Sequence, residues 1–536
     1  MYPSLRAFVE RLDSAGELVR IARECDPRLE IAEIADRTMK LPGGGPALLF
    51  ERVRGSRFPL VINAFGSARR MAWALGVDAI DEHARALAEL VGGQLPGTLW
   101  EKLKMLPKLA RVASSLPRSF SGAAPCQEVV DPSPDLRALP ILTCWPDDGG
   151  PFITLPVVIS HDPETGARNL GMYRMQLLGP RTTGMHWQAH KTGMRHFLKA
   201  KERGQRVPVA VVLGGDPAIT YSATAPLPDG VDELALAGFL RRRAVELVKC
   251  KTIDVEVPAD ADFVLEGYVD PREPLIDEGP FGDHTGFYTP RDKYPAFHVT
   301  CVTRRRDPIY PATIVGRPPM EDAWLGKATE RLFLPLLRLT MPELHDYNLP
   351  VEGVFHNMAI VAIDKQYPFH GRKIMHALWG LGQLMFTKCV IVVDKDVNVH
   401  DLAEVGWRVL NNIDPKRDVM ISDGPYDVLD HASCTVGFGG KMGVDATAKW
   451  REEGYEREWP RVAAMSAEVQ ARVDRLWPEL NIAAAQQRIA ATQTNFAAAQ
   501  KNHAAASPNI AAAQKEFAAA QKNHAAADSN IAAVQK

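Results

Sequence analysis

Ile153-Thr-Leu-Pro-Val-Val-Ile-Ser-His161 and Asn169-Leu-Gly-Met-Tyr-Arg-Met-Gln-Leu-Leu178 lie on either side of the polar stretch Asp162-Pro-Glu-Thr-Gly166. Two apolar runs separated by a turn that contains Pro and Gly predict a β-hairpin. Many short strands with few helices follow, which favours a closed or split β-barrel that we place at residues 118–320. Its further strands are expected at residues 207–214, 252–257, 263–269, 297–304 and 309–315, and its helix at about 232–246.

The chain before this barrel predicts a mixed α/β domain over residues 1–117. Ser4 can cap a helix whose apolar residues follow helical spacing up to Gly16, and Ser67 can cap a second helix. Short strands are expected at residues 47–53 and 60–64, and the basic, Pro-interrupted stretch 103–117 is typical of a linker.

After the barrel, helices and strands alternate over residues 321–480, which predicts an α/β domain suited to oligomerisation. The expected helices are residues 323–339, 372–384 and 402–412, and the expected strands are residues 354–364 and 388–394.

The tail, residues 481–536, is an Ala-rich heptad repeat. The second position of each heptad holds Ile482, Ile489, Phe496, His503, Ile510, Phe517, His524 and Ile531. This spacing predicts a narrow coiled-coil seam, weakened by Ala and His and broken at Pro508. The tail is either an accessory of oligomerisation or an expanded repeat without a function.

The bulk composition excludes several classes of protein. The net charge of -2 lacks the basic excess of a nucleic-acid-binding protein. The seven cysteines are scattered without CxxC spacing, so neither a zinc site nor a disulfide framework is indicated, and a reducing cytoplasm is expected. No apolar run is long enough to cross a bilayer, and the N-terminus has no signal-peptide core.

The stretch Glu278-Gly-Pro-Phe-Gly-Asp-His-Thr-Gly286 holds two carboxylates in a segment rich in Gly and Pro. Such a segment is a turn or the edge of a tight loop, where a backbone with little side-chain bulk can approach a ligand. Two acids held together interact, and one of them can then serve as a proton donor. The alternative is a solvated acidic loop, and the stretch by itself leaves both open.

Other candidate residues are weak signals when each is taken separately. Arg174 could bind a carboxylate or phosphate, or could pair on the surface of a sheet. His190 could ligate a metal, although a lone His is more often structural. Glu233 lies near a helix start, where the helix dipole favours a carboxylate in any case. Neither a P-loop, nor HExxH, nor GxSxG is found.

Taken together, the order Asn169, Arg174, His190, Glu233, Glu278, Asp283 resembles the UbiD family of reversible decarboxylases. The resemblance runs from Ser4 to about Pro460, and the repeated tail has no counterpart in it. The motif near the C-terminal end is most similar to the branch that acts on 3-polyprenyl-4-hydroxybenzoate. The motifs that carry the resemblance include Pro226-Leu-Pro-Asp-Gly230, Glu246-Leu-Val-Lys-Cys250, Glu278 to Gly286 and Gly440-Lys-Met-Gly-Val-Asp-Ala-Thr-Ala-Lys-Trp450.

The resemblance implies prenylated FMN as cofactor, made by a separate flavin prenyltransferase. It implies that the cofactor phosphate is bound through Mn²⁺ (or Mg²⁺), with K⁺ nearby. The family's metal-site residues, which thereby also hold the cofactor, fall on Asn169, His190 and Glu233. A Lys that some members place near the cofactor falls on Leu381 here.

The resemblance further implies a catalytic network of Arg174, Glu278 and Asp283. Loss of CO₂ from an aromatic carbon needs an electron sink that side chains cannot supply, so a cofactor must supply it. Glu278 would then donate the proton, while Arg174 would orient the substrate carboxylate, contact the cofactor and hold both acids. Asp283, where other members have Glu, is one methylene shorter.

The expected function is therefore non-oxidative decarboxylation of an aromatic acid, with 4-hydroxy-3-polyprenylbenzoate giving 2-polyprenylphenol in quinone biosynthesis. Another (hetero)aromatic or α,β-unsaturated acid is the alternative substrate, and a flavin-binding or assembly protein without catalysis is the alternative class. We expect a cytoplasmic homo-oligomer, a dimer or hexamer, that can touch the inner face of the cell membrane through the basic stretch Lys102 to Arg111. A solvated linker is the alternative interpretation of that stretch.

Overall fold

The computed structural model describes residues 2–91, 113–228 and 230–482 of the chain. By its internal contacts the chain divides into two units, Met1–Glu456 and Arg457–Lys536. The second unit holds helix α13, Ala467–Leu476, in its described part. The heptad repeat beyond Ile482 and the basic stretch 102–111 lie outside the described residues. The domain boundaries at residues 117, 320 and 480 stay predictions.

The N-terminal part is a small mixed α/β layer, as expected. The Ser4 side chain caps α1 by accepting a hydrogen bond from the Ala7 amide, and Ser67 caps α3 in the same way. Its sheet has the order β1-β2-β3-β20, of which β1 is Leu18–Cys25, β2 is Ala47–Val53, β3 is Leu60–Ile62 and β20 is Tyr310–Pro311. Its helices are α1 (Leu5–Ser14), α2 (Glu30–Met39), α3 (Ala68–Ala74) and α4 (Asp81–Val91).

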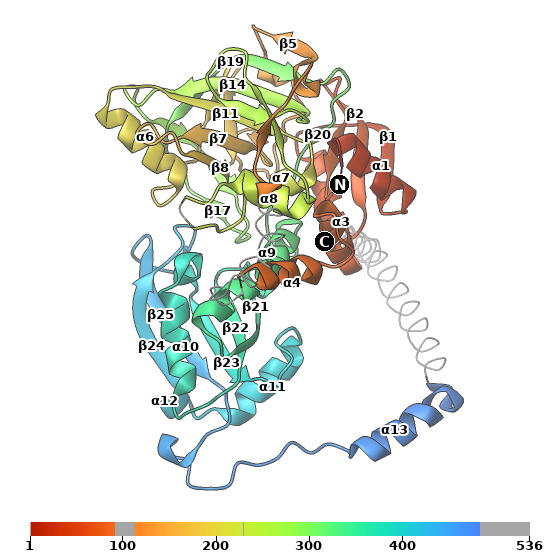
Figure 1. Ribbon diagram of the computed structural model, residues 1–536, viewed down its shortest axis with the longest axis vertical. Helices are drawn as coiled ribbons and strands as arrows, with labels where there is room; N and C mark the ends of the chain where they lie inside the picture. The colour runs from red at the N-terminus through yellow and green to blue at the C-terminus, as the bar shows by residue number, and fades with distance from the viewer. Residues whose placement is uncertain (1, 92–112, 229, 483–536) are drawn as a thin grey trace, which may run out of the picture. The chain divides into compact units, whose positions relative to one another are not determined.

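The central part contains a large sheet that curls as a half-barrel (Figure 1). Its order is β6-β9-β10-β19-β14-β11-β7-β8, with β5 paired to β19. The predicted hairpin is confirmed, because β7 and β8 pair antiparallel across the 162–167 turn. The strands are β5 (Val129–Asp131), β6 (Phe152–Ile153), β7 (Val157–His161), β8 (Arg168–Met172), β9 (Met175–Gly179), β10 (Thr182–Gly184), β11 (Val207–Leu213), β14 (Phe263–Val269) and β19 (Ala296–Arg304). Its helices are α6 (Thr192–Glu202), α7 (Pro217–Ser222) and α8 (Glu233–Arg241).

Several predicted elements of the central part are wrong in extent. The strand expected at 153–161 is interrupted before β7, where Pro156 has no amide to donate. The helix expected up to residue 246 ends at Arg241, because Arg242 adopts a left-handed conformation with φ of 55°. The chain then forms β12 (Glu246–Lys249), which pairs with β13 (Glu256–Pro258) and β4 (Arg118–Ser119) in a separate small sheet. The strand expected at 252–257 therefore begins later in the chain, as β13 at Glu256.

The strand expected at 309–315 is also shorter than predicted and belongs to a different sheet. Only β20 forms, and it pairs in parallel with β3, so that the chain returns to the N-terminal layer. Pro311 limits the ladder because it has no amide hydrogen.

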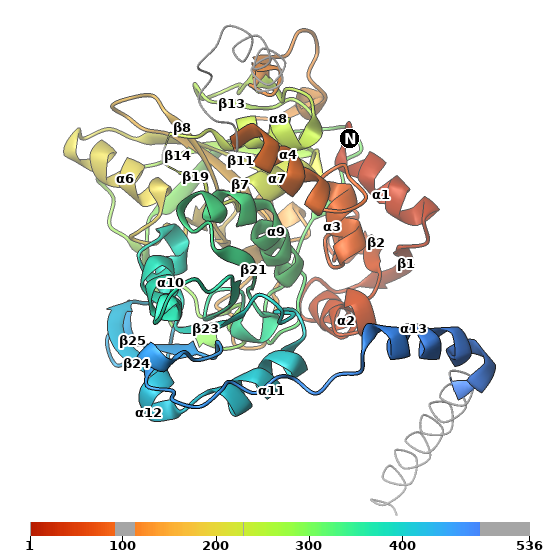
Figure 2. The same cartoon turned by 60° about the horizontal axis from the view of Figure 1, so that its bottom comes forward.

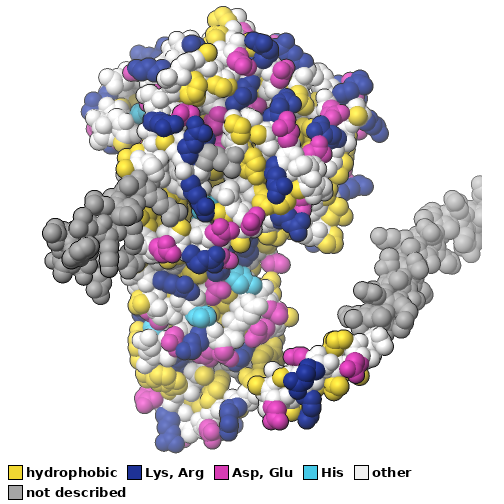
Figure 3. Space-filling model, turned by 45° about the vertical axis from the view of Figure 1, so that its right-hand side comes forward, with side chains coloured by type: hydrophobic (Ala, Val, Ile, Leu, Met, Phe, Trp, Pro, Cys, Tyr) yellow, Lys and Arg dark blue, Asp and Glu magenta, His cyan; other side chains and the backbone are white. Residues whose placement is uncertain are grey.

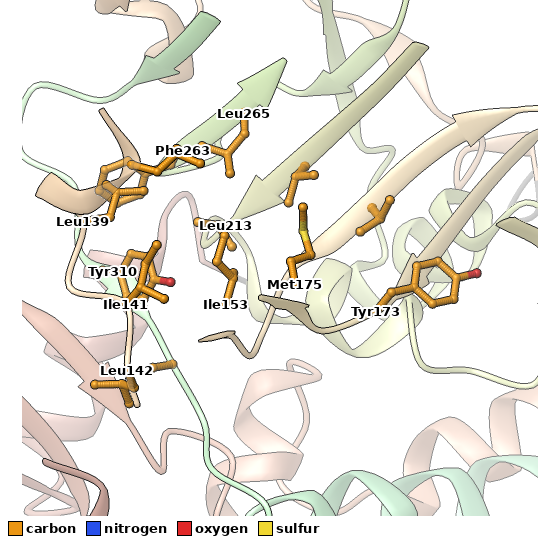
Figure 4. Packing of buried hydrophobic residues seen from close by; sticks show 14 of the residues in the cluster. Leu139, Ile141, Leu142, Ile153, Tyr173, Met175, Leu213, Phe263, Leu265 and Tyr310 are labelled. Carbon is orange, nitrogen blue, oxygen red and sulfur yellow. The ribbon is translucent and has the colours of Figure 1, made fainter. Parts of the chain in front are cut away.

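The most consequential correction concerns Arg174, which was expected on a continuous strand. β8 ends at Met172 and β9 begins at Met175, so that Arg174 lies in the break between two strands. Strand alternation directs Tyr173 and Met175 into the hydrophobic core, where both are buried (Figure 4). Arg174 therefore extends on the other side of the chain, away from that core.

The C-terminal part is the expected α/β layer, with sheet order β21-β22-β23-β25-β24. Alternate residues of β22 pack against α10 on one face and α11 on the other, as the two core clusters containing Ile374 and Val405 show. Helices α10 and α11 accordingly lie on opposite sides of the sheet (Figure 2). The strands are β21 (Leu344–Asn348), β22 (Met358–Ile363), β23 (Cys389–Asp394), β24 (Val419–Pro425) and β25 (Phe438–Asp445). The helices are α9 (Asp322–Thr340), α10 (His370–Trp379), α11 (Leu402–Asn412) and α12 (Pro415–Asp418).

Two predicted elements of this part are too long. The strand expected from residue 354 begins only at Met358, because Val354 and Phe355 have positive φ values of 47° and 52°. The helix expected at 372–384 ends at Trp379 and is followed by a short 3₁₀ helix, Gly382–Phe386.

No helix among the described residues is long and apolar enough to cross a membrane. On the face drawn in Figure 3, acidic and basic side chains are interspersed, with apolar side chains between them.

Candidate active site

The acidic segment 278–286 is built from two very short strand pairs. β15 (Ile276–Glu278) pairs with β18 (Asp292–Tyr294), and β16 (Phe281–Gly282) pairs with β17 (Tyr288–Thr289). The expectation of a tight turn rather than a helix is confirmed. Glu278 and Asp283 are both buried, so that the alternative of a solvated acidic loop is wrong.

Glycines allow this segment to pack closely on the 144–149 turn. A Cβ atom on Gly149 would lie 2.2 Å from the Gly279 carbonyl oxygen, and one on Gly282 would lie 2.2 Å from the Trp145 ring. Asp148 fixes the contact, because its carboxylate accepts hydrogen bonds from the amides of Gly282 at 2.8 Å and Trp145 at 2.9 Å. Asp148, which lies outside the acidic segment, therefore fixes the backbone between Glu278 and Asp283.

Arg174 binds both acids of the segment. Its Nε donates to Oε1 of Glu278 at 3.1 Å, and its Nη1 donates to Oδ2 of Asp283. Its Nη2 donates to the Thr289 hydroxyl at 3.3 Å, and its guanidinium lies 4.5 Å from the centre of the Phe281 ring. One buried cation thus compensates two buried carboxylates, in a geometry that only an Arg fork provides.

The two acids differ in their surroundings. Burial opposes ionisation of Asp283, but Arg174 and His284 outweigh it and hold the pKa of Asp283 well below its usual range. Burial likewise disfavours the imidazolium of His284, yet the 2.9 Å hydrogen bond to Asp283 raises the pKa of His284. Asp283 is therefore held as an anion by Arg174 and by its hydrogen bond to His284. The Oε2 atom of Glu278, by contrast, is buried and has no hydrogen-bond partner among the described residues.

The structure places Glu233 against β8, the strand that carries Asn169. Asn169 is buried on β8, and the amide of its neighbour Leu170 donates to Oε2 of Glu233 at 3.0 Å. Burial raises the pKa of Glu233 to about 7, opposed by that backbone amide. Within the described residues no Lys, Arg or His forms an ion pair with Glu233, so that its carboxylate is a site where a cation would be favourable.

His190 is placed differently from its two predicted partners. It is exposed in the turn before α6, and its ring centre lies 5.1 Å from that of Phe386 in the C-terminal part. No hydrogen bond or ion pair in the described part of the chain joins His190 to Asn169 or Glu233. Among the same residues, no three His, Cys, Asp or Glu side chains gather as a metal site.

Two histidines at the site were missed by the sequence reasoning. His186 Nδ1 lies 2.7 Å from Oε1 of Glu278, and the His186 ring lies 4.2 Å from that of Tyr294. His284 is within the acidic segment itself, next to Asp283, so its position alone could have identified it. His186 is separated from Glu278 by 92 residues, and its place four residues before His190 is the one local signal that could have identified it.

The C-terminal part contributes a wall to this site. The His284 ring stacks on Phe355 with ring centres 5.4 Å apart and meets the edge of His356 at 5.1 Å. At the end of the same segment, Phe287 lies 4.1 Å from the ring of His431. The acidic segment is thus packed between the central half-barrel and the C-terminal layer.

Comparison with known proteins identifies the family. The N-terminal domain of 3-octaprenyl-4-hydroxybenzoate carboxy-lyase matches residues 9–90, its Rift-related domain matches residues 118–318, and its C-terminal domain matches residues 323–446. An uncharacterized protein of Aquifex aeolicus is 51% identical over 481 residues, which cover 90% of this chain and 99% of that protein.

Solved structures share the fold over nearly their whole length. The UbiD-class enzyme HmfF from Pelotomaculum thermopropionicum, in complex with FMN, is 31% identical with a TM-score of 0.73 and covers 87% of this chain and 98% of its own. Vanillic acid decarboxylase from Sedimentibacter hydroxybenzoicus, in closed form, is 27% identical with a TM-score of 0.77. The match covers 89% of this chain and 99% of that enzyme. The chain therefore belongs to the UbiD family of carboxy-lyases.

Proposed function

We propose that the protein is a non-oxidative decarboxylase of an aromatic acid that works with prenylated FMN. The observation that carries the proposal is the buried network in which Arg174 binds Glu278 and Asp283, while one oxygen of Glu278 has no partner in the described part of the chain. Family membership supports it, as do the FMN complex of HmfF and the vanillic acid activity of a relative.

Asn169, Glu233 and His190 would hold the cofactor phosphate through Mn²⁺ or Mg²⁺, with K⁺ nearby. The fit is supported by the chemistry of the donors, since amide and carboxylate oxygens with imidazole suit these metals. It is supported further by the half-buried Glu233 carboxylate, which forms no ion pair with a Lys, Arg or His of the described residues. When bound, prenylated FMN supplies the electron sink that decarboxylation of an aromatic carbon requires.

The residues of the chain bind, orient and move a proton. Arg174 orients the substrate carboxylate and keeps both acids in place. Asp283 stays ionised and thereby holds Arg174 and His284. Glu278 donates a proton to the ring carbon that loses CO₂, because it is the acid of the pair with an oxygen that no described residue binds. The walls formed by Phe281, Phe355 and His356 exclude water from this transfer.

Within this class we favour 4-hydroxy-3-polyprenylbenzoate as the substrate, giving 2-polyprenylphenol for ubiquinone-type quinones. The names of the matching family models support this choice. Another (hetero)aromatic or α,β-unsaturated acid is the second candidate, supported by the vanillic acid decarboxylase relative. The intact set of Arg174, Glu278 and Asp283 argues against a flavin-binding or assembly protein without catalysis.

We further propose a homo-oligomer, a dimer or hexamer, assembled through the C-terminal layer. Strands β24 and β25 expose a cross-strand pair, Ile421 and Met442, and β25 also exposes Phe438. Apolar side chains together on one exposed sheet favour association with a second copy. If Ile421→Lys has the same oligomeric state as the wild type in analytical ultracentrifugation, the exposed face of β24 and β25 is not the interface.

The cell compartment proposed is the cytoplasm, with contact at the inner face of the membrane through the basic stretch 102–111. Vesicle flotation of the full chain, with and without charge reversal in this stretch, tests the contact. Equal flotation of both proteins would end this part of the proposal.

The function itself is tested by co-expression with a flavin prenyltransferase. Native mass spectrometry would score the bound flavin, and a panel of aromatic acids would be scored for CO₂ release. We expect bound prenylated FMN and turnover of at least one acid. A chain that binds the cofactor fully but releases CO₂ from no acid would support the non-catalytic alternative.

A further inference from the structure

His186 is joined to the proton-carrying acid but belongs to none of the residues expected at the site. We propose that His186 is a positioning residue that, together with Arg174, occupies Oε1 of Glu278 and so keeps the transferable proton on Oε2. This inference rests on the proposed role of Glu278 as the proton donor.

Oε1 of Glu278 receives two N–H donors. Arg174 Nε lies at 3.1 Å and His186 Nδ1 at 2.7 Å. An ionised carboxyl oxygen offers about two lone-pair sites, so both sites of Oε1 are taken. A proton taken up by Glu278 is therefore bound on Oε2, which is buried and has no partner among the described residues.

The direction of the His186 hydrogen bond follows from the other ring nitrogen. Nε2 is buried and has no partner in the described part of the chain. A buried N–H without an acceptor is rarer than an acceptor without a donor, so the proton belongs on Nδ1. Nδ1–H then donates to Glu278, and Nε2 is bare.

The groups that face His186 agree with a neutral ring. Burial lowers the pKa of His186, and the Arg174 cation lowers it further, against the opposing effects of Glu278 and Asp283. The Tyr294 hydroxyl, whose ring packs on His186, has its pKa raised to about 12 by burial and by nearby acids, so that it stays uncharged. A neutral His186 donates a single N–H and does not compete for the proton of Glu278.

The backbone beside His186 also leaves room for Oε2. A Cβ atom on Gly184 would lie 2.8 Å from Oε2 of Glu278, closer than side chains pack. The His186 amide donates to the Arg174 carbonyl at 3.4 Å, which places the end of β10 against the break that carries Arg174. One short segment thus contacts both oxygens of Glu278: His186 binds Oε1, and Gly184 leaves space for Oε2.

The first test is the tautomer of His186, which can be read without turnover. Nitrogen-15 NMR of the full chain labelled at histidine is expected to show a neutral imidazole with Nδ1 protonated and Nε2 bare between about pH 6 and 8, in addition to the similar signal of His356, whose Nδ1 donates to the Val354 carbonyl. The His186 signal should vanish in His186→Asn and persist in His284→Asn. A His186 ring with Nε2 protonated, or a charged ring, would overturn the proposal.

The second test separates the hydrogen bond from packing. Asn can place an amide N–H near the position of Nδ1, whereas Leu cannot donate. We expect His186→Leu with prenylated FMN bound to lose about 10- to 100-fold in kcat with little change in KM, and His186→Asn to stay within about threefold of wild type. Equal losses of kcat in both variants would mean that His186 acts only by packing, which would overturn the proposal.

The pH profile gives a readout that packing alone does not move. Loss of a donor to the carboxylate form favours the protonated form, so the limb due to Glu278 should move to higher pH in His186→Leu and stay in place in His186→Asn. An unmoved limb in His186→Leu would contradict the proposal. If the wild type releases CO₂ from no acid, the proposed function fails, while the NMR result still decides the position of the proton on His186.

Discussion

Two buried charge networks in this molecule differ in how completely their carboxylates are satisfied. In the C-terminal layer, Lys365 donates to both oxygens of Glu453, at 2.8 and 2.6 Å, and the amides of Phe369 and Trp450 bind the same two oxygens. At the candidate site, Oε1 of Glu278 lies within hydrogen-bond distance of Arg174 Nε and His186 Nδ1, and Oε2 has no partner among the described residues.

The difference teaches how to separate structural from catalytic acids in this chain. Both oxygens of the Glu453 carboxylate are fully hydrogen-bonded, so neither is available to bind a proton or a substrate. Its network therefore serves the packing of the C-terminal layer. An unpartnered buried oxygen costs free energy, and that of Glu278 lies in the network that also holds Arg174 and His186. We therefore assign the motif ending in Trp450 to folding, and the proposed proton transfer to the motif beginning at Glu278.

The largest effect is expected from Arg174→Met. Its removal leaves Glu278 and Asp283 buried without their cation, which should lower the free energy of unfolding by about 3–5 kcal/mol. Turnover should fall by about 1,000-fold because the substrate carboxylate and the acids lose their common donor. Denaturant unfolding and CO₂ release measure the two effects. Arg174→Lys, which keeps the charge without the fork, should recover stability more than turnover; equal recovery would contradict the account.

Glu453→Ala should affect stability alone. Lys365 would be left as an unpaired buried cation, at a cost of about 3–5 kcal/mol in the free energy of unfolding. Because this network touches no group of the site, kcat per folded, cofactor-loaded molecule should stay at the wild-type value. A large fall in kcat at full cofactor occupancy would break the distinction between the two networks.

Gly184→Ala should affect turnover alone. The added methyl group would meet Oε2 of Glu278 and displace it, and a displacement of about 1 Å at a reacting atom can cost about 100-fold in kcat. Gly179→Ala is the matched control, because its Cβ would meet only the Thr182 Cβ, at 3.9 Å. Similar rates for the two variants would mean that Oε2 is not the atom that carries the proton.

The smallest effect is the pH dependence contributed by His284. Since its pKa is raised in the folded protein, its stabilisation is fully present below the unfolded value of about 6.5 and is lost as pH rises through the folded value. The melting temperature should therefore fall more between pH 6 and 9 in the wild type than in His284→Asn. The exposed His345→Asn serves as the control and should follow the wild type. Parallel curves for wild type and His284→Asn would contradict the Asp283–His284 ion pair.

Local signals in the sequence predicted much of the fold. The caps Ser4 and Ser67, the hairpin at 162–166 and the alternating C-terminal layer all depend on neighbouring residues, and the structure confirms them. The break at Arg174 was missed because Tyr173 and Met175 face the core whether or not the strand is continuous. The positive φ values at Val354 and Phe355 could not be predicted either, since nothing local favours them.

At the site, the sequence predicted which acids and which arginine come together only through resemblance to a family. Glu278 and Arg174 are 104 residues apart, and their contact depends on the packing of the half-barrel. His186 was missed for the same reason. The ligand roles of Asn169, His190 and Glu233 stay predictions. In the structure, Glu233 binds the backbone amide of Leu170, the residue next to Asn169.

The most direct test of the central claim compares the wild type with Glu278→Gln, both loaded to equal occupancy with prenylated FMN. The amide preserves the shape of the side chain but cannot donate a carboxylic proton. CO₂ release and product formation would be measured under single-turnover conditions with an acid from the panel. The account predicts a loss of about 100-fold or more in product formation, with an unchanged melting temperature. Product formation at the wild-type rate would contradict it.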